Sequence, residues 1–237
     1  MSLFNPDARA EVLELEGGRL CLVIDDALLE PERVVEFAST NRDAFQAIDF
    51  SKYPGTWVDA PNELAEAYLH YFLQRARHRF DARRCRLAHI RLSMVTQPVA
   101  TLRPRQWLCH IDDFLLPPTE SMPASVLYLY KDALLGGTGF YVRSRPDAEV
   151  EAMLELADSL PADEFAQRTG LQPGYLHESN PWFRRIGGVA AKWNRLIFYD
   201  GGMLHSAEIA HPERLSGDPA TGRLTLNGFF TCRRNLA

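Results

Sequence analysis

Two short stretches of the sequence carry side chains that could together bind a divalent metal ion. His110 and Asp112 lie in a run, Gln106 to Asp112, that we expect to be a strand, and residues two apart on a strand point to the same face. His205 follows an apolar run and a glycine turn later in the chain. Two histidines and one carboxylate occupy one face of an octahedral ion and leave its other positions open, which is the ligand set of non-haem Fe(II) sites that react with O2.

Each of these residues also has a plainer interpretation. His110 could be an ordinary histidine whose ring is satisfied by Asp112 or by a backbone carbonyl group. Asp113 could replace Asp112 as the acidic ligand if the strand were bulged. His205 could simply be packed in the core.

A later stretch carries a basic side chain on a strand that we expect to be buried. The sequence from Thr221 to Phe229 alternates between polar and apolar residues, so Arg223, Thr225 and Asn227 would share one face. A guanidinium on an inner strand requires an anion, because an unpaired buried charge is costly. Its planar fork matches a carboxylate in a bidentate way, although Arg223 could also form an ordinary ion pair within the protein.

The elements that would position these residues are mostly short strands. Helices are expected from Pro31, over 61–80 and over 147–169 with a break at Pro161. Besides the runs already named, we expect strands at 20–24, 87–94, 125–130, 139–142, 196–199 and 203–209. This pattern favours an α+β protein in which helices pack against an antiparallel sandwich or barrel. On the strand at 87–94, His89 and Arg91 share the polar face; we expect them to form structural pairs, and the alternative is that they line the same cavity as the metal ligands.

The order of these motifs resembles that of the Fe(II)/2-oxoglutarate-dependent dioxygenases, in particular the prolyl-hydroxylase-like and phytanoyl-CoA-hydroxylase-like branches. The shared features are H-x-D at 110–112, a distal histidine at 205, and an arginine at 223 followed two residues later by a hydroxyl group. Two supporting islands stand in the matching order, Leu22-Val23-Ile24-Asp25-Asp26 before a helix, and Ser125-Val126-Leu127-Tyr128-Leu129-Tyr130 before Gly136-Gly137-Thr138-Gly139-Phe140.

The resemblance implies a double-stranded β-helix (jelly-roll) core with packed N-terminal helices and a helical insertion. As a single domain over 1–237, it would have a helix-rich part at 1–85 and a core at 86–231, with the insertion at about 147–185. The resemblance also implies that His110, Asp112 and His205 bind Fe(II). Arg223 and Thr225 would hold the distal carboxylate of 2-oxoglutarate, with Tyr128 as a further contact and Arg214 as the alternative cation.

The implied activity is an oxygenase reaction, most simply hydroxylation of a small molecule or of an amino-acid side chain in a peptide. O2 and 2-oxoglutarate would be consumed, and succinate and CO2 released. Two other functions stay open from the sequence. One is a non-catalytic jelly-roll binding module, and the other is a cupin-like metalloenzyme that does not use 2-oxoglutarate.

The composition of the chain limits the classes of partner that we expect it to bind. The 237 residues carry a net charge of −5, with 46% hydrophobic and 24% charged residues, which is typical of a globular protein and unfavourable for binding nucleic acid. We expect no membrane partner, because no apolar run approaches the ~20 residues that span a bilayer. The N-terminal residues do not resemble a secretion signal, and the four cysteines are widely spaced, so we expect reduced thiols and a cytoplasmic location.

Overall fold

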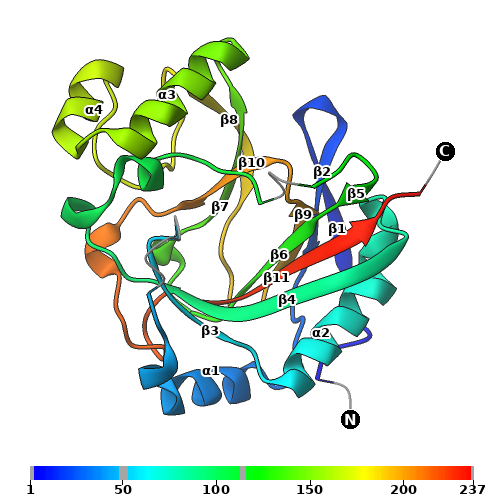
Figure 1. Cartoon of the computed structure of the whole chain (residues 1–237). Helices are drawn as coiled ribbons and strands as arrows, with labels where there is room; N and C mark the ends of the chain where they lie inside the picture. Colours follow the sequence, from blue (N-terminus) through cyan, green and yellow to red (C-terminus); the bar gives the residue numbers. More distant parts are fainter. Residues whose placement is uncertain (1–2, 48–52, 113–115, 236–237) are drawn as a thin grey trace.

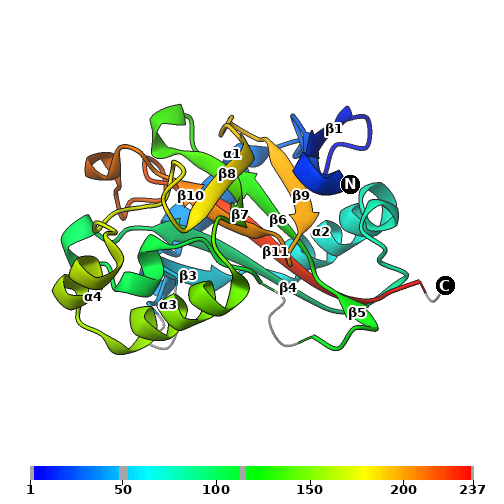
Figure 2. The same cartoon turned by 90° about the horizontal axis from the view of Figure 1, so that it is seen from above.

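The computed structural model describes residues 3–47, 53–112 and 116–235, which form two antiparallel sheets with helices packed against them (Figures 1 and 2). The larger sheet contains β1 (Ala10–Leu15), β2 (Arg19–Ile24), β3 (Gly55–Asp59), β4 (Arg84–Val95), β5 (Glu120–Ser121), β6 (Pro123–Tyr128), β9 (Leu196–Asp200) and β11 (Leu224–Arg233). The smaller sheet contains β7 (Gly137–Arg143), β8 (Phe183–Val189) and β10 (Leu204–Glu208). The α-helices of the described residues are α1 (Pro31–Thr40), α2 (Asn62–Arg75), α3 (Asp147–Ser159) and α4 (Ala162–Thr169).

The chain passes repeatedly from one sheet to the other. The larger sheet has the order β1-β2-β9-β6-β11-β4-β3, with β5 also paired to β11, and the smaller sheet has the order β10-β7-β8. The first six strands all belong to the larger sheet, whereas β9, β10 and β11 alternate between the two sheets. In the middle of the larger sheet Thr225 of β11 lies opposite Ser93 of β4 on one side and Tyr128 of β6 on the other. Ser93, Thr225 and Tyr128 therefore lie side by side across three neighbouring strands.

The outer face of the larger sheet is covered by α2, which packs against β4. Its buried residues recur every three or four positions, which is the pattern of an amphipathic helix. The ring of Phe72 stacks on Phe230 of β11 at 4.0 Å between centroids. Because neighbouring residues of a strand point to opposite faces, this packing leaves Thr225 and Asn227 of β11 on the inner face.

The predicted helical insertion forms α3 and α4, and the break falls at Pro161, which precedes the first residue of α4. These helices lie on the opposite side of the molecule from α2 (Figure 1). Both contact a short 3-10 helix, Pro104–Trp107, and Phe165 of α4 packs edge-on against Trp107 with the centroids 5.5 Å apart. The insertion therefore supports the segment that leads to His110.

The strand expected over Gln106–Asp112 is wrong. Residues 104–107 form the 3-10 helix, which begins with Pro104 and is capped by a hydrogen bond from the Arg103 amide to the Gln106 side chain at 2.8 Å. Only His110 pairs further along, in an isolated bridge with His205.

Four strands were not predicted from the sequence, namely β1, β3, β5 and β8. Most side chains of β1 are exposed, and β8 combines two arginines with two glycines, so neither shows a two-residue hydrophobic period. The start of β8 falls inside the range 147–185 that the sequence assigns to the insertion. In the described ranges no helix is both long and apolar enough to cross a membrane.

Candidate metal centre

Backbone pairing brings His110, Asp112 and His205 together. His110 and His205 exchange two backbone hydrogen bonds, of 3.0 and 2.9 Å, and the Asp112 amide donates to the Gly201 carbonyl oxygen at 2.8 Å. Residues 110–112 thus run antiparallel beside the turn and strand that carry His205. An extended segment keeps side chains two apart on one face, so the imidazole and the carboxylate still converge although no regular strand forms.

The three side chains each offer one ligand atom, and these atoms lie within 4.8 Å of one another. The distance from His205 Nε2 to Asp112 Oδ2 is 3.4 Å, and that from His110 Nε2 to Asp112 Oδ1 is 3.7 Å. Adjacent ligands of an octahedral ion lie about 3 Å apart when each bond is about 2.1 Å. The set could therefore bind a single divalent ion after a small inward movement.

The tautomer of His205 is set by its neighbours. Its Nδ1 atom donates a hydrogen bond to the Met203 carbonyl oxygen at 2.8 Å, because a carbonyl group can only accept. The lone pair of Nε2 is then directed to the side of Asp112. Such a bond to the other ring nitrogen is typical of metal-binding histidines. His205 is buried and packs beside Tyr199 at 4.7 Å between ring centroids.

Solvent reaches the three ligands unequally. The side chain of His110 is 52% exposed, whereas those of Asp112 and His205 are 11% and 7% exposed. The site is therefore closed around Asp112 and His205 and open beside His110. Asp113, the alternative acidic ligand, lies outside the described residues.

Arg223 is buried on the inner side of the larger sheet, directly before β11. Its Nε and Nη2 atoms donate to the carbonyl oxygens of Leu135 and Gly137, each at 3.0 Å. Among the described residues no carboxylate forms an ion pair with this guanidinium. Thr225, two residues on, is also buried and donates to the Ser93 carbonyl oxygen at 3.3 Å.

The remaining predicted residues, Tyr128, Arg214 and His89, each contact another side chain of the protein. Tyr128 is buried, and its hydroxyl donates to Thr138 Oγ1 at 2.8 Å. Arg214 is exposed and bound to Asp132 through an ion pair of 2.6 Å, so it does not join the site. His89 is exposed as well and lies 3.8 Å from Asp59.

Three tyrosines near Arg223 were not predicted as site residues. Burial raises the pKa of Tyr130 to about 12, and the positive charge of Arg223 opposes the shift. Burial also raises the pKa of Tyr53, against the charges of Arg223 and Arg91 and against side-chain hydrogen bonding. Tyr175 shows the same direction of shift, with burial as the main cause and the charge of Arg223 opposing it. A period of two places Tyr130 beside Tyr128, whereas Tyr53 and Tyr175 lie in irregular segments that carry no such signal.

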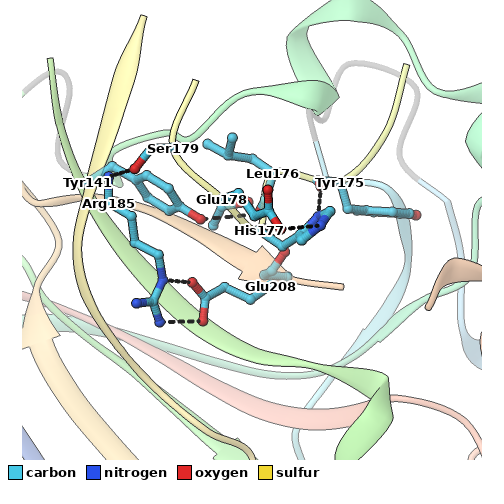
Figure 3. A network of polar contacts seen from close by, with 10 residues as sticks. Tyr141, Tyr175, Leu176, His177, Glu178, Ser179, Arg185 and Glu208 are labelled. Atoms are coloured by element: carbon cyan, nitrogen blue, oxygen red, sulfur yellow. Dashed lines mark hydrogen bonds and ion pairs between the residues drawn. The ribbon is translucent and has the colours of Figure 1, made fainter. Parts of the chain in front are cut away.

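A polar network fastens the segment around Tyr175 to the smaller sheet (Figure 3). The Tyr141 hydroxyl donates to the Leu176 carbonyl oxygen at 3.3 Å. Arg185 of β8 pairs with Glu208 of β10, and its Nη2 atom lies 3.1 Å from Oε2. Tyr175 points away from this pair in Figure 3, and its hydroxyl donates to the Gln97 carbonyl oxygen at 2.7 Å. The network thus ties the segment of Tyr175 to the sheet that carries His205.

Comparison with solved structures finds similar arrangements at low sequence identity. The epimerase SnoN from nogalamycin biosynthesis, described as non-haem and α-ketoglutarate dependent, has a TM-score of 0.49 and 11% identity over 91% of this chain and 81% of its own. HygX from Streptomyces hygroscopicus, solved with nickel and 2-oxoglutarate, has a TM-score of 0.47 and 11% identity over 90% and 82%. A Pseudomonas putida prolyl-4-hydroxylase has a TM-score of 0.41 and 14% identity over 88% and 89%.

No functionally curated protein matches the sequence. A family model does match, and it covers residues 6–230, which is nearly the whole chain. The chain belongs to this family, the family of unknown function DUF6445.

Proposed function

We propose that this chain is an Fe(II)- and 2-oxoglutarate-dependent oxygenase that hydroxylates a small molecule or an amino-acid side chain. The observation that carries the proposal is the buried guanidinium of Arg223. It has no acidic partner among the described residues and lies on the inner side of the larger sheet, where His205 of the candidate metal centre packs beside Tyr199 of β9. A buried cation without a counter-ion is costly, so its presence favours a site built for an anionic ligand.

The residues of the metal centre fit iron. His110, Asp112 and His205 supply two neutral imidazole nitrogens and one carboxylate, and this set with open positions is typical of non-haem Fe(II) oxygenases. Iron bound there would supply O2 activation coupled to the oxidative decarboxylation of 2-oxoglutarate to succinate and CO2. The hydrogen bond from His205 Nδ1 to Met203 would orient the ring and select the neutral tautomer whose Nε2 lone pair can bind the metal.

The chain's own residues would hold the cosubstrate. We assign the distal carboxylate of 2-oxoglutarate to Arg223 and Thr225, whose Nη atoms and hydroxyl oxygen lie near one end of the inner face. The bonds from Arg223 to the Leu135 and Gly137 carbonyl groups would fix its fork in place before the diacid arrives. Tyr128 faces the same row opposite Thr225 and would form part of the wall, because its hydroxyl already bonds to Thr138.

The strand order supports a double-stranded β-helix as the core of a single domain. In the larger sheet β4, β11, β6 and β9 are consecutive neighbours. In the smaller sheet the His110 segment bridges to β10, which pairs with β7, which pairs with β8. Eight segments are therefore divided between two layers, four in each, as in a jelly roll. The metal ligands would then lie at the open end of these two layers.

The test is the release of succinate from 2-oxoglutarate in air, with Fe(II) and without added substrate. We expect slow, Fe(II)-dependent release from the natural protein, no release from His205→Ala and, at limiting 2-oxoglutarate, release from Arg223→Gln that is roughly tenfold slower or more. Arg214→Gln is the matched control and should behave as the natural protein does. Folded protein that binds metal but not 2-oxoglutarate would favour the cupin-like alternative, and failure to bind either would favour a non-catalytic module.

A further inference from the structure

A second guanidinium faces the inner side of the larger sheet. Arg91 of β4 lies opposite Asn227 of β11, two residues before Ser93, and is half-buried. Burial lowers the pKa of Arg91, and the charges of Tyr53 and of Asp112 in the candidate metal centre oppose this shift. Arg91 and Arg223 therefore lie at two different places on the same face.

Aromatic rings surround the Arg91 guanidinium. Its central carbon lies 4.1 Å from the ring centroid of Trp57, 4.8 Å from that of Phe229 and 5.9 Å from that of Tyr53. Aromatic rings at these distances attract a guanidinium through cation–π interactions. They do not neutralise the charge, and they leave the N–H groups at the edge of the guanidinium for a planar acceptor.

No such acceptor is present among the described residues. The Arg91 side chain makes no hydrogen bond or ion pair there, and its Nε atom is buried without an acceptor. The Oδ1 atom of Asn227, across the strand pair, is likewise buried without a donor. The acids whose charges act on Arg91 are Asp112 and Asp59, of which the first belongs to the metal centre and the second lies beside His89.

We infer that Arg91 binds a carboxylate group of the primary substrate, next to the metal centre. The inference rests on the proposed function and deepens it, because it names carboxylic acids as the substrate class. A carboxylate accepts two parallel N–H bonds from the edge of a guanidinium group. The aromatic rings contact the face of the Arg91 guanidinium, so the N–H groups at its edge stay available for such a carboxylate. The anion could also come from 2-oxoglutarate itself, and the experiment separates these two sources.

The experiment uses the whole chain loaded with Mn(II) and N-oxalylglycine, an unreactive analogue of 2-oxoglutarate. It is titrated calorimetrically with aliphatic, aromatic and amino carboxylic acids, each beside its primary amide. We expect at least one acid to bind tenfold or more tightly than its amide. In Arg91→Gln this preference should fall to within twofold, whereas Arg91→Lys should retain part of it. The exposed Arg84 of the same strand provides the control variant, Arg84→Gln, which should keep the full preference.

A second readout localises the bound acid. Because Trp57 stacks on Arg91, its fluorescence should change on titration with the preferred acid, and Trp57→Phe should remove that change. The affinity of the Mn(II) protein for 2-oxoglutarate should differ less than twofold between Arg91→Gln and the natural chain.

Three results would overturn the inference: a panel in which no acid is preferred to its amide, a preference that survives Arg91→Gln, or a tenfold loss of 2-oxoglutarate affinity in that variant. The last result would mean that the carboxylate bound by Arg91 belongs to 2-oxoglutarate. A failure of the proposed function is seen separately, as natural protein that does not bind 2-oxoglutarate at all.

Discussion

The backbones of His110 and His205 exchange two hydrogen bonds, of 3.0 and 2.9 Å, and this places their rings 4.4 Å apart between centroids. The two imidazoles therefore lie side by side through backbone pairing, before any metal binds. A centre that is organised in this way loses little conformational freedom on binding. It also means that a metal ion would clamp together two segments that are nearly a hundred residues apart in the chain.

Metal binding should raise the thermal stability of the fold. At a free metal concentration a hundred times its Kd, binding stabilises the folded state by about 2.7 kcal/mol. For a chain of this length that corresponds to a rise in Tm of roughly 5–10 °C. Differential scanning calorimetry with Mn(II), then with excess EDTA, measures the shift and its reversal. Asp112→Asn should fold and show no shift; a shift of equal size in that variant would place the metal elsewhere.

Replacing Arg223 should weaken 2-oxoglutarate binding specifically. Hydrogen bonds to charged groups contribute about 1.5–3 kcal/mol, so Arg223→Gln should raise the Kd of 2-oxoglutarate roughly ten- to a hundredfold. Isothermal titration of the Mn(II) protein gives this Kd, and the affinity for Mn(II) itself should not change. Arg214→Gln is the matched control, since Arg214 is exposed and bound to Asp132. Equal Kd values for the two variants would refute the role of Arg223.

We expect the helical insertion to influence metal affinity through the contact of Phe165 with Trp107. Phe165 and Phe230 are both fully buried, so replacing either by alanine should cost about 3–5 kcal/mol in the free energy of unfolding, measured in urea. Only Phe165→Ala should also weaken Mn(II) binding, because Phe165 packs on the 3-10 helix that leads to His110. Phe230 packs on α2 at the outer face. Equal effects of the two variants on Mn(II) affinity would contradict this link.

The sequence predicts which side chains share a face where polar and apolar residues alternate regularly along a strand. Arg223 and Thr225 share an inner face as their two-residue period indicates, because β11 lies in the middle of the larger sheet. His110 and Asp112 converge although their strand was wrongly predicted, because a short extended bridge preserves the same alternation. Tyr53 and Tyr175 could not be predicted, since their positions depend on tertiary contacts of irregular segments. The break at Pro161 was predictable, because proline inside a helix removes a backbone hydrogen bond and clashes with the preceding turn.

Acid should weaken the contact between β2 and the segment before β9. Asp25 accepts hydrogen bonds from Arg195 Nε at 2.6 Å and from Lys192 Nζ at 2.8 Å. The bond from Arg195 is the main cause that lowers the pKa of Asp25 from 3.8 to about 2. A carboxyl with a depressed pKa stabilises the fold above its unfolded value, and this stability is lost as the pH falls through the folded value.

The corresponding variant is Asp25→Asn. At pH 7 it should lose about 1 kcal/mol in the free energy of unfolding, a small value because solvent screens the partly exposed pair. The difference from the natural chain should shrink as the pH falls from 3.8 towards 2. Denaturant titrations across that range measure it, and a difference that grows towards low pH would show the opposite sign of linkage.

The central claim is that one metal ion and 2-oxoglutarate bind together between His205 and Arg223. The most direct measurement is the visible absorption spectrum of the anaerobic protein as Fe(II) and then 2-oxoglutarate are added. We expect a charge-transfer band that needs both additions and that is absent in folded His110→Ala and His205→Ala. Folded, iron-loaded natural protein that shows no band with 2-oxoglutarate, or a band that survives the loss of either histidine, would contradict it.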